Sequence, residues 1–292
     1  MKKTILVTTI FLAAAITAGC GSDDRSTPVI AQKSTISGAV ADGYLERAQV
    51  FLDRNFNYIH DDGEPSTTTD AGGNYILTVD PDDVGRFPVV ALAIAGQTID
   101  HDIEIRTLTE SYLLCIDKTA LSGTVSNFIS PISTQIREMM ETGKFQNIQQ
   151  AAEELRLRLN MPAGVNMHAD YMLLGSSASL DANRAFYQGL HATAQNMASL
   201  MGGQAGQVMS IQGTRITNVD VNHFRSMMGS IFGNLSTVRA TSPVNPAHDA
   251  IMAQLREDLR NNISIAPSTI SGHPFMNFSS SYRPHRGITG GR

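Results

Sequence analysis

The stretch NYILTVDPDDVGRFPVVALAI, residues 74–94, contains two short apolar segments on either side of a cluster of turn-forming residues. The segments cover residues 74–79 and 89–94 and are short enough to be strands. Asp80-Pro81-Asp82-Asp83 lies between them, and Pro and Asp both favour turns. This part of the chain is therefore predicted to form two strands joined by a loop.

Four further segments of this kind occur between residues 34 and 120, at 35–40, 48–52, 99–105 and 112–116. Turn-forming pairs such as Asp-Gly and Ala-Gly separate them, and no helical period is visible. Short strands at this spacing are typical of a β-sandwich or a barrel. We therefore predict that residues 34–120 form an antiparallel β-sandwich.

The composition of the 292-residue chain excludes several classes of protein. Hydrophobic residues make up 42% and charged residues 17%, with two cysteines and no Trp. These values exclude a disulfide-rich miniprotein, a multi-cysteine zinc module, a c-type cytochrome and a collagen. No apolar run reaches the roughly 20 residues of a membrane-spanning helix. The formal net charge of −5 argues against a nucleic-acid partner.

The first twenty residues have the features of a secretory signal. Lys2 and Lys3 precede an apolar run at residues 5–16, and Thr17-Ala18-Gly19-Cys20 follows. A charged start, a short apolar stretch and small residues define such a signal. The alternative is a buried N-terminal helix or strand, but the residues directly after Cys20 are polar.

Two small residues followed by cysteine resemble the lipobox of bacterial lipoproteins. The resemblance implies that residues 1–19 are a signal peptide and that Cys20 carries a diacylglyceryl group and an N-acyl chain, which anchor the protein to a membrane. Gly21 resembles the sorting context for an outer membrane. Several acyl chains anchor stably where a single chain does not. Residues 20–33, rich in polar residues, are predicted to form a flexible tether.

The predicted sandwich is strongly acidic. Residues 42–110 contain fourteen acidic and four basic side chains, a net charge of −10. Such a concentration of negative charge repels itself unless a cation or a partner offsets it.

The sequence DRNFNYIHDDGE, residues 53–64, has the spacing of a calcium-binding loop. Oxygen-bearing side chains stand at loop positions 1, 3, 5, 9 and 12, and a backbone carbonyl is expected at position 7. The candidate ligands are Asp53, Asn55, Asn57, Ile59, Asp61 and Glu64. Tyr58 stands at position 6, where such a loop normally has glycine, and a left-handed backbone there costs roughly 1–2 kcal/mol. The alternatives are a solvated acidic hairpin without an ion and another metal held with His60.

Three segments, SGAVADGYL at 37–45, AQVFLD at 48–53 and TDAGGNY at 69–75, resemble the carboxypeptidase-regulatory-like, or transthyretin-like, β-sandwich. The Asp-x-Asn-x-Asn pattern at 53–57 resembles the calcium-binding B-type repeats of bacterial adhesins, which often carry glycine where Phe56 and Tyr58 stand. The resemblance implies a prealbumin-like sandwich that serves as a stable surface module with calcium in this loop. It implies no peptidase activity.

The composition changes near residue 122, after which apolar residues recur at helical spacing. The five helical segments cover residues 132–140, 148–159, 180–201, 221–235 and 251–263. Ser130-Pro131 supplies a capping hydroxyl and a proline in the first turn. The methionines in these segments are interpreted as core residues. We predict that residues 121–265 form a C-terminal α-helical bundle, so that the fold class is α+β in two parts. The segment also resembles the uncharacterised helical region of other bacterial lipoproteins, which implies no activity.

No common catalytic motif was recognised, neither a nucleophile elbow, a phosphate loop nor a His-Glu-x-x-His sequence. Asp100-His101-Asp102 could orient a base but is interpreted as surface polarity. His168 and Asp170 are placed in a loop, and His191 is interpreted as a surface or hydrogen-bonded histidine. Cys115 lies in a predicted strand and is interpreted as a buried, inert thiol.

Residues 266–292 are rich in Ser, Gly, Pro and Asn and carry three arginines and no acid. They are predicted to form a flexible basic tail. The alternative is a tail that docks onto the acidic β-part, another chain or an anionic polymer of the cell surface.

Together these features predict a non-catalytic, lipid-anchored protein of the cell envelope, at the outer membrane, with one structural calcium ion. Its role would be surface adhesion, envelope assembly or ligand presentation, with an envelope protein or a glycan as partner. One alternative is an envelope hydrolase with its site in or beside the helical part. Another is a module that binds a peptide or a glycan between the two parts.

Overall fold

The computed structural model describes residues 32–102, 104–121, 127–176, 178–241 and 245–268. The predicted signal peptide, Cys20, residues 20–31 of the predicted tether and residues 269–292 of the predicted tail lie outside these ranges. Within the described ranges, no helix combines the length and the hydropathy needed to cross a membrane.

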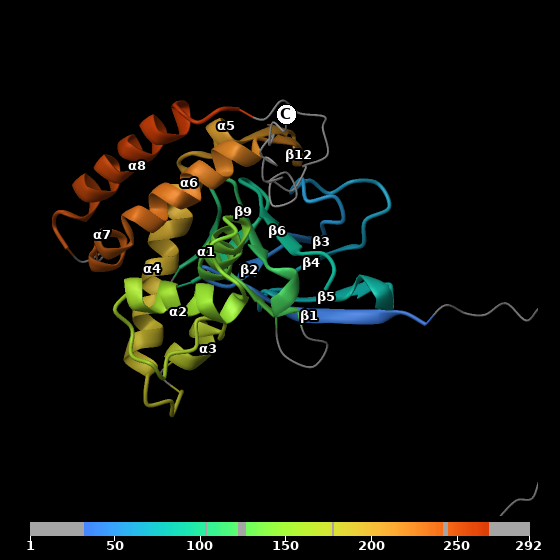
Figure 1. The fold of residues 1–292 in the computed structure, drawn as a ribbon, viewed down its shortest axis with the longest axis horizontal. Helices are drawn as coiled ribbons and strands as arrows, with labels where there is room; N and C mark the ends of the chain where they lie inside the picture. Colours follow the sequence, from blue (N-terminus) through green and yellow to red (C-terminus); the bar gives the residue numbers. More distant parts are fainter. Residues whose placement is uncertain (1–31, 103, 122–126, 177, 242–244, 269–292) are drawn as a thin grey trace, which may run out of the picture. The chain divides into compact units, whose positions relative to one another are not determined.

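The described chain has a mixed α+β fold, with most strands in its first part and most helices in its second (Figure 1). The strands are β1 (Ser34–Val40), β2 (Leu45–Glu46), β3 (Gln49–Leu52), β4 (Ser66–Thr68), β5 (Asn74–Val79), β6 (Val89–Ala93), β7 (Ile99–His101), β8 (Ile105–Thr107), β9 (Tyr112–Ile116), β10 (Asn127–Ile129), β11 (Met209–Gln212) and β12 (Arg215–Val219).

Eight α-helices occur among the described residues, and a short 3-10 helix follows each of β5 and β9. The α-helices are α1 (Pro131–Glu141), α2 (Ile148–Arg158), α3 (Tyr171–Gly175), α4 (Arg184–Gly202), α5 (Ala205–Val208), α6 (Val221–Gly233), α7 (Leu235–Ala240) and α8 (His248–Ser264).

The strands pair in four sheets, with orders β4-β3-β6-β9, β10-β1-β5, β2-β7-β8 and β11-β12. Every pairing between these strands is antiparallel except that of β1 with β10, which is parallel. At the parallel pair, Gly38 lies opposite Asn127, and a Cβ atom on Gly38 would collide with the Asn127 backbone. The region predicted to be an antiparallel sandwich therefore takes part in one parallel strand pair. The second strand of this pair, β10, lies outside the predicted range of residues 34–120.

All six predicted strand segments contain strands, and the segment 99–105 contains β7 and the start of β8. The five predicted helical segments are confirmed as α1, α2, α4, α6 and α8, with small differences at their ends. The hairpin of β11 and β12 was not predicted and lies within the region expected to be a helical bundle. Gly213 in its turn has a φ of 63°, a left-handed conformation that glycine adopts without strain.

One hydrophobic core contains residues from both the strand-rich and the helix-rich part of the chain. Helix α1 is central to it, because α1 contacts β9 on one side and α2, α4 and α6 on others (Figure 1). Ser130 caps α1 by accepting a hydrogen bond from the Ser133 N–H, and residues from Pro131 to Met139 are all buried. Several methionines interpreted as core residues are also buried, namely Met139, Met197, Met201, Met227 and Met228.

Candidate functional site

The predicted calcium loop, residues 53–64, connects β3 to β4. Its first residue, Asp53, follows directly after the buried strand β3 and is itself completely buried. One carboxylate oxygen of Asp53 accepts a hydrogen bond from the Asn57 N–H and the other accepts one from the Tyr58 N–H, each at 3.1 Å. Burial raises the pKa of Asp53, whereas the positive charge of Arg137 and these N–H groups oppose the increase. Asp53 therefore fixes the curvature of the loop from inside.

The side chains of Asn55, Asn57 and Asp61 converge within the loop. Asn55 Oδ1 accepts a hydrogen bond from the Asn57 N–H at 3.2 Å, and Asn57 Oδ1 accepts one from the Ile59 N–H at 2.7 Å. Both amide groups donate to the same oxygen, Asp61 Oδ2, each at 2.7 Å. The side chains at loop positions 3, 5 and 9 thus meet, and those at positions 3 and 5 form turns stabilised by their own oxygens.

Glu64 closes the loop at position 12. Its two carboxylate oxygens accept hydrogen bonds from the Arg54 N–H at 2.6 Å and the Asp61 N–H at 3.0 Å. His60 points away from this set, since Gln49 Nε2 lies 3.1 Å from its Nδ1 and the Glu64 carbonyl lies 3.1 Å from its Nε2. Both ring nitrogens of His60 are therefore occupied by protein groups.

The backbone of the loop turns at two residues that are not glycine. Phe56 has a φ of 63° and Tyr58 a φ of 62°, both in the left-handed region. Tyr58 therefore makes the turn at position 6 itself, at a backbone cost of roughly 1–2 kcal/mol. Such conformations persist when surrounding contacts hold them in place.

The donor set of the loop fits a calcium ion better than a softer metal. Carboxylate, amide and carbonyl oxygens are hard ligands, which calcium takes in sets of six to eight without strict geometry. No group of three or more His, Cys, Asp or Glu side chains that could hold a metal occurs among the described residues. This absence concerns His, Cys, Asp and Glu side chains only. It does not cover the two asparagines and the Ile59 carbonyl group among the predicted ligands of this loop.

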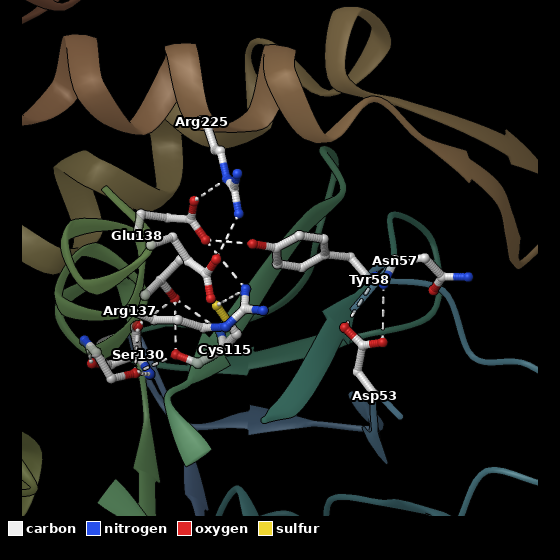
Figure 2. Close-up of polar contacts among 11 residues, drawn as sticks. Asp53, Asn57, Tyr58, Cys115, Ser130, Arg137, Glu138 and Arg225 are labelled. Carbon is white, nitrogen blue, oxygen red and sulfur yellow. Dashed lines mark hydrogen bonds and ion pairs between the residues drawn. The ribbon is translucent and has the colours of Figure 1, made fainter. Parts of the chain in front are cut away.

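The side chain of Tyr58 extends from the loop into the protein interior and is completely buried (Figure 2). Its hydroxyl group donates to Glu138 Oε1 at 2.5 Å. The Arg137 guanidinium lies over its ring at 4.4 Å, and the Phe224 ring packs at 5.1 Å. These contacts with α1 and α6 hold the left-handed backbone at position 6, and they connect the loop to the helices.

Glu138 is the centre of a buried ionic network (Figure 2). Arg137 Nη1 lies 3.2 Å from Glu138 Oε1 and 3.6 Å from Cys115 Sγ, while Arg225 Nε lies 3.6 Å from Glu138 Oε2. Arg225 also pairs with Glu141 at 2.8 Å. Cys115 is buried as predicted, and burial raises the pKa of its thiol to about 12. The thiol is therefore protonated at neutral pH and unreactive.

The interpretation of Asp100-His101-Asp102 as surface polarity is wrong for Asp100, which is only 3% exposed. His101 pairs with Glu46 at 2.6 Å, and Asp102 accepts a hydrogen bond from the Gln195 side chain. The resemblance to the carboxypeptidase-regulatory-like sandwich includes the expectation that the zinc motif of the enzymes, His-x-x-Glu, is absent, and this expectation is wrong for the sequence, because His101 and Glu104 have that spacing. The Nε2 atom of His101 contacts Glu46.

The three other residues considered for chemistry, Asp170, His191 and His168, have different surroundings. Asp170 caps α3 by accepting from the Leu173 N–H and also accepts a hydrogen bond from the Tyr44 hydroxyl at 2.9 Å. His191 stacks on Tyr171 at 5.9 Å and lies 3.4 Å from Asp102. Burial lowers the pKa of both His191 and His168. His191 is thus a packed, partnered histidine, as one interpretation of the sequence expected.

Replacing Tyr58 by Phe tests the connection between the loop and α1. The change removes the hydroxyl donor and leaves a buried oxygen of Glu138 with one partner fewer. We expect the free energy of unfolding to fall by about 1–3 kcal/mol, the cost of an unsatisfied buried polar group. Urea denaturation monitored by circular dichroism measures it. Tyr44→Phe, which removes the hydroxyl of a partly exposed tyrosine that donates to Asp170, is the control and should cost less than about 1 kcal/mol. An equal loss in both variants would contradict the predicted role of Tyr58.

Comparison of the chain with protein families, curated proteins and solved structures finds no match.

Proposed function

We propose that this chain is a non-catalytic, lipid-anchored protein of the bacterial cell envelope whose 53–64 loop holds one structural calcium ion. Asp53, Asn55, Asn57, Asp61 and Glu64 would bind the ion with side-chain oxygens, and Ile59 with its carbonyl group. The ion would offset the negative charge of this region. The protein would act in surface adhesion, envelope assembly or ligand presentation at the outer membrane, with an envelope protein or a glycan as its partner.

The geometry of the loop is the observation that supports this proposal most. The side chains at positions 1, 3 and 5 each accept hydrogen bonds from backbone N–H groups further along the loop, and those at positions 3, 5 and 9 meet. A loop whose side chains are already ordered loses less conformational entropy on binding an ion. The amide nitrogens of Asn55 and Asn57 are the groups that converge on Asp61, so both amides would have to rotate to present their oxygens to the ion. Tyr58, the residue that departs from the usual glycine, adopts the left-handed conformation that position 6 requires.

We also propose that the strand-rich part is a prealbumin-like β-sandwich and the helix-rich part a small bundle. Along β5, buried and exposed residues alternate, as expected for a strand with one face against a core. Strands β6 and β9 are buried along their whole length, which supports packing on both faces. The core shared by both parts suggests that they fold together.

A calcium titration tests the site directly. Isothermal titration calorimetry of the chelator-treated protein should show one calcium ion per chain. Asp61→Asn should weaken binding by about tenfold or more, because a carboxylate on which two loop amides converge becomes a neutral amide. Asp62→Asn removes the same charge from the exposed neighbour and should keep the affinity within about threefold. Absence of calcium binding, or equal losses in the two variants, would contradict the proposal.

The two cysteines provide a test of the anchor. In a bacterial host, the full chain should fractionate with membranes and carry the mass of a diacylglyceryl group and an acyl chain on Cys20. Cys20→Ser should release the protein into the soluble fraction, whereas Cys115→Ser, the control, should leave it bound. A protein that stays at the membrane after Cys20→Ser would disprove lipid anchoring at this residue.

A further inference from the structure

A polar cavity of about 310 Å³ lies where the strands β8 and β9 meet the helices α4 and α8. Its lining includes Asp42, Asp100, Tyr112, Ser199 and Arg256. The volume is at the lower end of the range for sites that bind small molecules, roughly 300–1,000 Å³. It is large enough for a ligand with several non-hydrogen atoms, and it is separate from the 53–64 loop.

Two carboxylates at this cavity are buried and only partly satisfied. Asp42 is 7% exposed and Asp100 is 3% exposed. One oxygen of Asp42 accepts a hydrogen bond from the Tyr112 hydroxyl at 3.0 Å, and one oxygen of Asp100 accepts from Arg106 at 3.3 Å. The second oxygen of each carboxylate, Oδ1, is buried without a hydrogen-bond partner among the described residues. Two acceptors at one cavity therefore lack a donor.

The backbone places these two acids close together. Gly43 follows Asp42 directly, and a Cβ atom at Gly43 would collide with Asp100 Oδ1 and with the Cβ atom of Asp102. Only glycine allows this approach. The Asp102 side chain accepts a hydrogen bond from Gln195, and as a carboxylate it offers no donor to the two acids beside it. The Asp102 backbone N–H does face Asp100 and opposes the increase in the pKa of that carboxyl group.

The cavity also has a donor that lacks an acceptor. Arg256 donates through Nη2 to Ser199 Oγ at 2.7 Å, but its Nε is buried without a partner among the described residues. A buried polar atom without a partner is costly, and several at one cavity are uncommon in a native protein. The cavity therefore presents two free acceptors and one free donor, contributed by three parts of the chain.

We propose that this cavity binds a small zwitterion of amino-acid size, whose ammonium group lies between Asp42 and Asp100 and whose carboxylate group binds Arg256. An ammonium group has three donors and suits two free carboxylate oxygens, and a guanidinium group suits a carboxylate. Two opposite charges on one ligand match the two kinds of free group in the lining. The inference concerns a site that the proposed calcium ion does not touch.

The test uses the purified full chain in detergent and the twenty free amino acids as probes. At least one of them should raise the melting temperature and bind in calorimetry. Its N-acetyl derivative, which lacks the ammonium charge, and its amide, which lacks the carboxylate, should each bind at least about tenfold more weakly. If none of the twenty raises the melting temperature or binds, the cavity holds water only and the proposal is wrong.

Variants localise the binding. The variants are compared at pH 8, above the pKa of about 7 to which burial raises Asp42, so that this carboxyl group is ionised in the natural chain. Asp42→Asn and Arg256→Gln should each weaken binding of the best amino acid by about tenfold or more, because each removes one charge that faces the ligand. Asp82→Asn, at an exposed acid outside the cavity, is the matched control and should bind as the natural chain does. Asp42→Asn replaces a buried carboxyl group, whose charged form burial disfavours, by a neutral group of similar size, so we expect the variant to fold. Unchanged affinity in both cavity variants would overturn the proposal.

Discussion

Arg137→Met is expected to lower the free energy of unfolding by about 3–5 kcal/mol, the usual cost of breaking a buried ion pair by removing one partner. Arg137 is 1% exposed, lies over the Tyr58 ring and pairs with Glu138 at 3.2 Å. Without the guanidinium, Glu138 keeps only the Tyr58 hydroxyl and the more distant Arg225. The loss would be a large fraction of the stability of an ordinary domain, about 5–15 kcal/mol.

A double-mutant cycle separates the ion pair from simple packing. Arg137→Met combined with Glu138→Gln should cost less than the sum of the two single changes by about 1 kcal/mol or more, because the two groups are in contact. Arg260→Met, at an exposed pair with Glu257, is the control and should cost about 0–1 kcal/mol. Chemical denaturation measures all four values. A small loss in Arg137→Met, or additive losses in the cycle, would show that the network contributes little.

The second large effect is expected in the pH dependence of stability, and Asp42 causes it. Burial, followed by the negative charge of Asp100, raises the pKa of Asp42 from its ordinary 3.8 to about 7. The Tyr112 hydroxyl and Asp102 also face this carboxyl group, and they act in opposite directions. Between the two pKa values the folded chain holds a proton that the unfolded chain has lost. The contribution of Asp42 to stability therefore falls as the pH rises through this range, by about 4 kcal/mol.

The variant Asp42→Asn removes this proton and its pH dependence. The free energy of unfolding of the variant minus that of the natural chain should increase from pH 4 to pH 8, by up to about 4 kcal/mol. The measurement is chemical denaturation in a chelator, which excludes any contribution from calcium, and Asp82→Asn is the control. A difference that stays constant with pH would mean that Asp42 titrates near its ordinary value in the folded chain.

The strands and long helices could be predicted because their signals are local. The apolar segments at 74–79 and 89–94 contain β5 and β6, and Ser130 caps α1 as its position before Pro131 suggests. Short elements had weaker signals. Strand β10 has only three residues, and its partner β1 lies about ninety positions earlier in the chain.

The burial of the polar face of α1 could not be predicted from the sequence. Arg137 and Glu138 look like the solvated side of an amphipathic helix, beside the apolar Ile132 and Ile136. They are buried because Tyr58, eighty residues away, and Arg225, on α6, supply their partners. On sequence alone, Tyr58 is the weak point of the calcium loop, because it stands where glycine is usual. The spacing of residues in the loop does not predict that the Tyr58 side chain packs against α1 and α6.

The same limit applied to the acids of the cavity. The sequence pattern predicts that Asp100 lies on a short strand, but it does not predict that other elements bury this residue. The close approach of Gly43 to Asp100 depends on tertiary contacts. By contrast, the spacing of oxygens at 53–64 is local, and the structure brings the side chains at positions 3, 5 and 9 together.

The effect of calcium on stability tests the central claim most directly. The protein is stripped with a chelator, and its free energy of unfolding is measured with and without calcium for the natural chain, for Asp53→Asn with Glu64→Gln, and for Asp62→Asn. Calcium at a hundredfold excess over its dissociation constant should stabilise the natural chain and Asp62→Asn by about 2.7 kcal/mol, and the double variant by much less. No stabilisation of the natural chain, or equal stabilisation of all three proteins, would contradict a calcium site in this loop.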